Sequence, residues 1–101
     1  MNEKIRLIHP HGKKAVNMDK IKYDIIKKYL LACLKSGKKA YQKEIKEAIT
    51  QNIKQNKIEF QGSIDWYLEW VKLDLEAKRE IFRIGEKSPY KYSIAKSVHK
   101  N

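Results

Sequence analysis

Residues Gly62–Ile94, GSIDWYLEWVKLDLEAKREIFRIGEKSPYKYSI, carry the clearest structural pattern of the chain. Apolar residues recur at helical spacing through residues 63–80, which predicts one long helix with Ser63 as its N-cap. Apolar and polar residues then alternate on either side of a turn at residues 85–89, which predicts a two-stranded hairpin over residues 81–94. The stretch therefore predicts a helix that runs directly into a β-hairpin.

Two shorter helices are expected before this stretch, at residues 19–35 and at residues 42–55, because each carries an apolar stripe. The stripes consist of Ile21, Ile25, Ile26, Tyr29, Leu30, Cys33 and Leu34 in the first helix and Ile45, Ala48, Ile49 and Ile53 in the second. Residues 38–41 between them are long enough only for a bridging strand. Residues 1–16 are a β-prone arm, which lies either on the edge of a small sheet or over the core.

The order of three helices and a C-terminal hairpin predicts an α+β fold of the winged helix-turn-helix type. The 101 residues suffice for one core, so residues 1–101 are expected to form a single domain. No apolar run approaches the roughly 20 residues that span a bilayer, and residues 1–6 lack the apolar segment of a signal peptide. The one cysteine, Cys33, lies on an apolar helix face and suits a reducing compartment. We therefore expect a cytoplasmic protein with no membrane partner.

The formal net charge of +11 points to a polyanionic partner, because a basic surface attracts phosphate backbones. Part of this charge reflects composition, since lysine far outnumbers arginine and the chain is also rich in isoleucine and asparagine, as AT-rich coding favours. Residues 1–57 hold fifteen Lys/Arg against five Asp/Glu, a net of +10, and residues 85–101 hold four against one, a net of +3. Residues 58–84 hold four against six, a net of −2, so the third helix is the least basic part of the chain.

The third helix has more apolar surface than two neighbouring helices can cover. At about 100° per residue, Ile64, Leu68, Val71 and Leu75 form the core face, with Tyr67 beside them. A second apolar line consists of Trp66, Trp70, Leu73, Ala77 and Ile81, and the polar sector consists of Asp65, Glu69, Lys72, Glu76, Arg79 and Glu80. Another part of the chain, or a partner, must cover the tryptophan line.

Two groups of residues carry a family resemblance. The first is HPHGK at residues 9–13, followed by Asp19-Lys20 and Lys22-Tyr23-Asp24; the second is Trp66-Tyr67, then VKLDLEAK at residues 71–78, Ile81, Arg83 and the Ser88-Pro89 turn. Together they resemble a small, largely uncharacterised family of bacterial winged-helix proteins over nearly the whole chain. The resemblance implies the fold but no particular activity, because winged helices serve DNA binding, RNA binding and protein docking alike.

The leading functional hypothesis is binding of double-stranded DNA, as in a transcriptional regulator. In the usual docking the third helix enters the major groove and the wing contacts the flanking backbone. The candidate contacts are Ser63, Lys72 and Arg79 on the third helix, Arg83, Lys87 and Lys91 on the wing, and Lys38, Lys39 and Lys43 at the start of the second helix. Because the polar sector of the third helix holds four acids and two bases, backbone contacts from the first two helices and the wing are the alternative route.

A second hypothesis is a docking module that forms a homodimer or binds a protein partner without nucleic acid. It rests on Trp66, Trp70 and Leu73, because exposed aromatic residues mark interfaces. The competing interpretation is that the apolar residues of the arm fold over these side chains and make them part of the core. Burial is weighted roughly two to one over an interface, because large aromatic side chains are usually buried for packing.

No enzymatic activity is expected, because the sequence shows no constellation of titratable groups around a cleft. His9 and His11 supply two imidazoles, whereas a structural zinc site needs four ligands and a catalytic site three. Their expected role is to cap backbone groups in a turn, and His99 lies in a C-terminal tail. The four glycines form no phosphate-binding loop. Neither a metal nor another cofactor is therefore expected.

Overall fold

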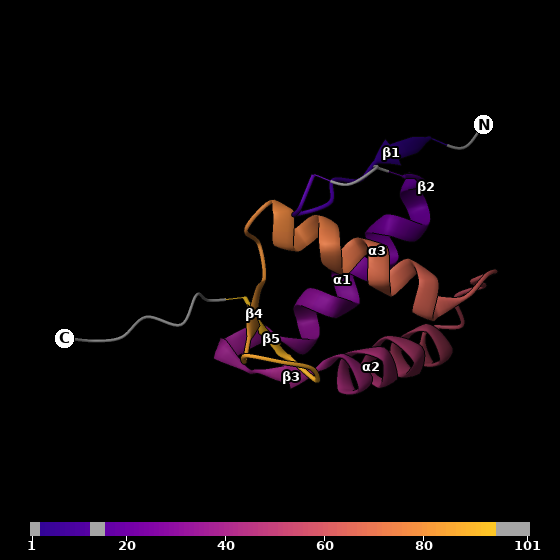
Figure 1. Ribbon diagram of the computed structural model, residues 1–101. Helices are drawn as coiled ribbons and strands as arrows, with labels where there is room; N and C mark the ends of the chain where they lie inside the picture. Colours follow the sequence, from indigo (N-terminus) through magenta and orange to yellow (C-terminus); the bar gives the residue numbers. More distant parts are fainter. Residues whose placement is uncertain (1–2, 13–15, 95–101) are drawn as a thin grey trace.

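The structure, a computed structural model, describes residues 3–12 and 16–94 (Figure 1). It is α+β with three helices, as expected: α1 (Lys20–Cys33), α2 (Gln42–Gln55) and α3 (Ile64–Ala77). The strands are β1 (Lys4–Arg6), β2 (Asn17–Asp19), β3 (Ala40–Tyr41), β4 (Phe82–Ile84) and β5 (Lys91–Ser93), and a short 3-10 turn, η1 (Lys35–Gly37), follows α1. No helix in the described ranges is long and apolar enough to cross a membrane.

Polar side chains cap the starts of α1 and α3. The Asp19 carboxylate accepts a hydrogen bond from the Ile21 N–H at 2.9 Å, which satisfies one of the free donors of the first turn of α1. The Ser63 hydroxyl accepts a hydrogen bond from the Trp66 N–H at 3.2 Å, so Ser63 is the N-cap that its sequence position predicts. Both helices therefore begin where local hydrogen bonding dictates.

The end of α3 differs from the expected one. The helix ends at Ala77 rather than at residue 80, because Arg79 adopts a left-handed backbone conformation with φ of 62°. The Glu80 N–H then turns back to the Leu75 carbonyl oxygen at 2.8 Å. Glycine usually occupies such a position, so a helix that ends this way at an arginine carries no recognisable stop signal in its sequence.

The C-terminal hairpin belongs to a three-stranded antiparallel sheet and is not a separate two-stranded unit. The strand order is β3-β5-β4, with Ala40 opposite Tyr92 on one side of β5 and Phe82 opposite Ser93 on the other. β3 lies between α1 and α2, where a bridging strand was expected. Tyr92 and Ser93 are both buried, at 3% and 2% exposed, although successive residues of a strand point to opposite faces.

The N-terminal arm forms a second sheet with β2. Ile5 lies opposite Met18 in the antiparallel pair, and the Leu7 N–H donates a hydrogen bond to the Val16 carbonyl oxygen at 2.8 Å. The first helix was expected to begin at residue 19, but residues 17–19 form a strand because their backbone groups pair with the arm, and α1 begins at Lys20. Leu7 and Met18 are almost completely buried, so the arm is part of the core. The two sheets lie toward opposite ends of α1 (Figure 1).

The buried face of α2 is the predicted one, whereas the buried face of α1 is rotated relative to the predicted apolar stripe. Ile45, Ile49 and Ile53 of α2 are all buried. On α1, Ile21 of the expected stripe is 62% exposed, whereas Tyr23 is 2% exposed. The reason is tertiary: Tyr23 faces α3, where its hydroxyl finds a hydrogen-bond acceptor, and a buried tyrosine needs such a partner.

Candidate functional site

Five of the candidate DNA-contacting lysines are exposed around the junction of β3, α2 and the hairpin. Lys38 and Lys43 line one broad groove along α2. Lys43 also lines, with Tyr41 and Pro89, a second hollow beside the hairpin turn. The Lys91 ammonium lies 5.2 Å from the centre of the Tyr41 ring. Together, Lys38, Lys39, Lys43, Lys87 and Lys91 are called the basic end here.

The lysines of the basic end are not neutralised by neighbouring carboxylates of the described residues, a property that they share with exposed lysines elsewhere, such as Lys28, Lys54 and Lys57. Within residues 3–12 and 16–94, none of them lies within ion-pair distance of a carboxylate. The cations that do form ion pairs are Lys20, Lys27, Lys46, Lys72, Lys78 and Arg83. The groove along α2 is not uniformly basic, because Glu44 and Glu47 also line it. The basic end can therefore neutralise an external anion without first breaking an ion pair.

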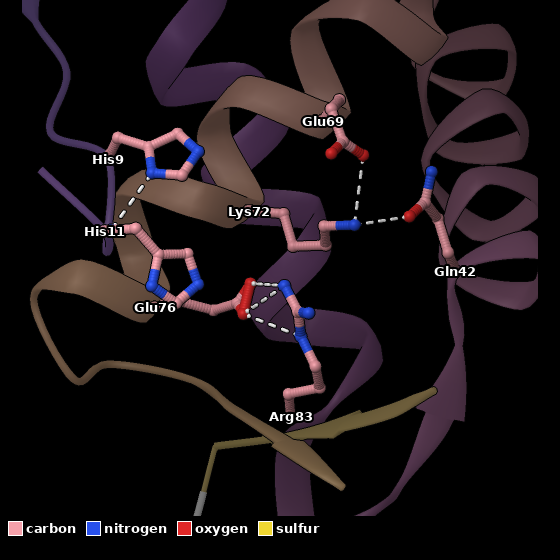
Figure 2. Close-up of polar contacts among 7 residues, drawn as sticks. All are labelled: His9, His11, Gln42, Glu69, Lys72, Glu76 and Arg83. Carbon is pink, nitrogen blue, oxygen red and sulfur yellow. Dashed lines mark hydrogen bonds and ion pairs between the residues drawn. The ribbon is translucent and has the colours of Figure 1, made fainter. Parts of the chain in front are cut away.

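Lys72, a candidate contact on α3, is buried instead, with 4% of its surface exposed. Its ammonium donates hydrogen bonds to the Gln42 Oε1 at the start of α2 and to the Glu69 Oε1 at 3.0 Å (Figure 2). It also lies 4.9 Å from the centre of the Tyr92 ring. Lys72 is in the polar sector of the helix, as expected, but Gln42 of α2 and Tyr92 of β5 lie against its ammonium group. It is therefore not presented to nucleic acid.

Arg83, a candidate contact on the wing, is engaged by α3. Its Nε donates to Glu76 Oε2 at 3.1 Å and its Nη2 donates to Glu76 Oε1 at 3.0 Å (Figure 2). The hydrogen bonds to Glu76 raise the pKa of Arg83, and its guanidinium lies 4.8 Å from the centre of the Tyr90 ring. A carboxylate already fills the planar fork of this side chain, so Arg83 fastens β4 to α3.

The other two candidate contacts on α3 sit at its two ends. Ser63 uses its hydroxyl as the N-cap, and Arg79 is exposed just beyond the last turn. Because α3 is 14 residues long, these side chains lie roughly 20 Å apart along the helix axis. The structure thus leaves no cluster of cations on the body of α3 among the described residues.

The tryptophans of α3 differ in how far the arm covers them. Trp66 is 45% exposed, whereas Trp70 and Leu73 are half-buried. The His9 ring of the arm lies 6.3 Å from the Trp70 ring, in an edge-to-face arrangement, and the Trp66 and Trp70 rings are 6.5 Å apart. The arm thus covers Trp70 in part, as the core interpretation predicts, but leaves Trp66 exposed.

Asp74 is a fully buried carboxylate that the sequence pattern did not reveal. Its Oδ1 accepts a hydrogen bond from the Ile8 N–H at 2.8 Å, and its Oδ2 accepts one from the Tyr23 hydroxyl at 2.6 Å. The Lys78 ammonium lies 2.9 Å from the same Oδ2. Burial raises the pKa of Tyr23, and the hydrogen bond to Asp74 raises it further. The carboxylate therefore joins the arm, α1 and α3.

One sequence signal could have located Asp74. It follows Tyr67 by seven residues, and seven residues return to nearly the same side of a helix. Tyr67 was placed beside the core face, so Asp74 lies at that same margin. An acid at this position requires a polar partner from another element, which the helical period does not identify.

The arm histidines lie beside α3 (Figure 2). The His11 N–H donates a hydrogen bond to the His9 Nδ1 at 3.0 Å, in keeping with the capping role expected in this turn. Within the described ranges, no three His, Cys, Asp or Glu side chains are grouped so that they could hold a metal ion. His99 lies outside the described residues.

Comparison with known proteins gives a family but no activity. No curated protein and no solved structure matches the chain. A family model described as "Family of unknown function (DUF6958)" matches residues 4–92, a range that starts with β1 and reaches into β5. The chain therefore belongs to this family of unknown function, DUF6958.

Proposed function

We propose that the protein is a winged-helix domain that binds double-stranded DNA through phosphate contacts of the basic end. The order α1-β3-α2-α3-β4-β5 supports the fold, because a strand between the first two helices joins the C-terminal hairpin in one sheet. The observation that carries the function is the exposure of five lysines at one end of the molecule without a carboxylate partner among the described residues. Lysines in this state suit a phosphate backbone.

In this proposal α3 does not read bases in the usual way. Its solvent side presents Asp65, Trp66 and Glu69, and acids next to phosphates oppose binding. Lys72 and Arg83 are held by Glu69 and Glu76. The contacts to DNA are therefore positional rather than sequence-specific, and the proposal assigns no catalytic activity to the protein.

The test is fluorescence anisotropy of a labelled random duplex titrated with protein at several salt concentrations. The triple variant Lys38→Glu, Lys39→Glu and Lys43→Glu should weaken binding at low salt. Each lost phosphate contact should reduce the slope of log K against log salt by about 0.9, so the slope should fall by roughly 2.7 if all three lysines bind phosphates.

The matched control carries the same change in charge elsewhere, in Lys28→Glu, Lys54→Glu and Lys57→Glu, which are also exposed and outside the basic end. This control should lose less affinity and keep more of the slope, because only long-range charge changes. Equal losses in both triple variants would reject the basic end as the binding surface. Absence of binding by the wild-type protein at low salt would reject DNA binding itself.

A second candidate function, protein docking through α3, is favoured by one observation. Trp66 is 45% exposed beside the half-buried Trp70, although an indole of this size is usually covered. Light scattering tests self-association: if Trp66 lies in a homodimer interface, Trp66→Ala should lower the measured mass while circular dichroism stays unchanged. A monomeric wild-type mass would reject the homodimer.

A further inference from the structure

A hollow of about 360 Å³ lies between the start of α2, the middle of α3 and the hairpin. This volume is near the lower limit for pockets that hold small molecules. Its lining includes the polar side chains Gln42, Lys43, Glu69, Lys72, Arg83 and Ser88, so one carboxylate faces the hollow beside three cations. It also includes three tyrosines, Tyr41, Tyr90 and Tyr92.

Internal ion pairs already use two of the three cations of the hollow. Lys72 is bound by Glu69 and Gln42, and Arg83 is bound at two points by Glu76 (Figure 2). Both cations also cover tyrosine rings of the hollow, which holds the aromatic walls in place. These pairs build a rigid lining whose charges are largely balanced.

The groups that remain for a ligand are mainly donors. Gln42 accepts the hydrogen bond from Lys72 through Oε1, so its amide nitrogen is left to donate. Ser88 contributes a hydroxyl and Lys43 an exposed ammonium. Within the part of the chain that the structure describes, Lys43 is the lining cation without a carboxylate at ion-pair distance. Such a set of donors suits an anion.

We propose that this hollow binds a phosphate group. A planar carboxylate is best recognised by the two-pronged fork of an arginine, but Glu76 occupies the fork of Arg83. The remaining donors are separate single groups: the Gln42 amide and the Lys43 ammonium at the start of α2, and the Ser88 hydroxyl in the hairpin turn. A tetrahedral phosphate, whose oxygens point in several directions, can accept from all three. The phosphate belongs either to a polynucleotide backbone or to a small phosphorylated molecule.

The test is a titration of the full-length ¹⁵N-labelled protein with inorganic phosphate, followed by NMR at constant ionic strength. Saturable amide shifts should be concentrated at Gln42, Lys43 and Ser88. The double variant Lys43→Gln and Ser88→Ala should weaken phosphate binding roughly tenfold or more, because it removes one charged and one neutral donor. Lys54→Gln on the far end of α2 is the control and should bind as the wild type does.

Shifts that do not saturate, or that spread equally over all exposed lysines, would overturn the inference, as would equal affinity in the double variant and the control. Two further ligands identify the source of a bound phosphate. If the double variant also weakens duplex DNA relative to Lys54→Gln, the hollow seats a backbone phosphate. If a nucleoside monophosphate saturates the same amides and duplex affinity is unchanged, the ligand is a small molecule. The phosphate titration does not depend on DNA binding. A protein that binds no DNA can therefore still bind phosphate in the hollow, and the two proposals fail separately.

Discussion

The buried carboxylate of Asp74 offers the sharpest test of how this fold is held together. Replacement of Asp74 by alanine removes the acceptor of three donors, the Ile8 N–H, the Tyr23 hydroxyl and the Lys78 ammonium. Tyr23 is 2% exposed, so its hydroxyl is then left in the core without this partner. Lys78 is different, because its side chain is 32% exposed and can turn to water.

The magnitude follows from these contacts. A buried donor left unsatisfied costs about 1–3 kcal/mol, which applies to the Tyr23 hydroxyl. The hydrogen bond from the Ile8 N–H is only partly buried, so its loss adds about 0.5–1.5 kcal/mol, as for an ordinary hydrogen bond. The loss of the ion pair with Lys78 adds little, because the ammonium is partly solvated. We expect Asp74→Ala to lower the free energy of unfolding by about 2–5 kcal/mol, a large part of the roughly 5–15 kcal/mol of a typical domain.

The assay is urea unfolding followed by circular dichroism. The control is Asp24→Ala, because Asp24 is an exposed acid of α1 that pairs with the exposed Lys20 and should contribute little to stability. If Asp74→Ala does not fold, Tyr23→Phe tests the same cluster and should cost about 1.5–3 kcal/mol, as for a hydrogen bond to a charged group. A loss below about 1 kcal/mol in both variants, close to that of the control, would refute the stabilising role inferred for this cluster.

Three further predictions concern groups that the structure places clearly. Ser63→Ala should lower the free energy of unfolding by about 1 kcal/mol, because α3 loses its N-cap; an unchanged urea midpoint would contradict this. Burial raises the pKa of the Cys33 thiol, so iodoacetamide at pH 8 should alkylate the native protein more slowly than the urea-unfolded chain, as mass spectrometry would show. The pKa of Tyr23 is raised above its ordinary 10.0, so the unfolded chain ionises first and stability falls as pH rises past that value. Tyr23→Phe should reduce this decline by up to about 1.4 kcal/mol per pH unit, and parallel stability curves would exclude the effect.

The solvent exposure of the lysines in the basic end was predictable from the sequence. Lys38 and Lys39 follow a glycine-ended helix and precede a short strand, and such connecting positions are normally solvated. Lys43 lies off the apolar stripe of the second helix, on the side that faces water. The gathering of these three lysines with Lys87 and Lys91 depends on the pairing of β3 with β5, which the order of elements suggests but does not prove. The filled fork of Arg83 and the hollow beside it depend on side chains from separate elements, so no local pattern announced them.

The pattern of apolar residues is enough to predict the three helices, their order and the buried stripe of α2. The period of apolar residues was sufficient there, because α2 buries one side at Ile45, Ile49 and Ile53. The burial of Lys72 and Asp74, the exposure of Trp66 and the packing of the arm into the core depend on tertiary contacts. The physical reason is that a helical period reports the side on which a residue lies and not what covers that side. A charged group can be buried only when partners reach it. The oppositely charged partners, Glu69 for Lys72 and Lys78 for Asp74, are local, but the other partners come from 30 residues away for Lys72 and from 51 and 66 residues away for Asp74.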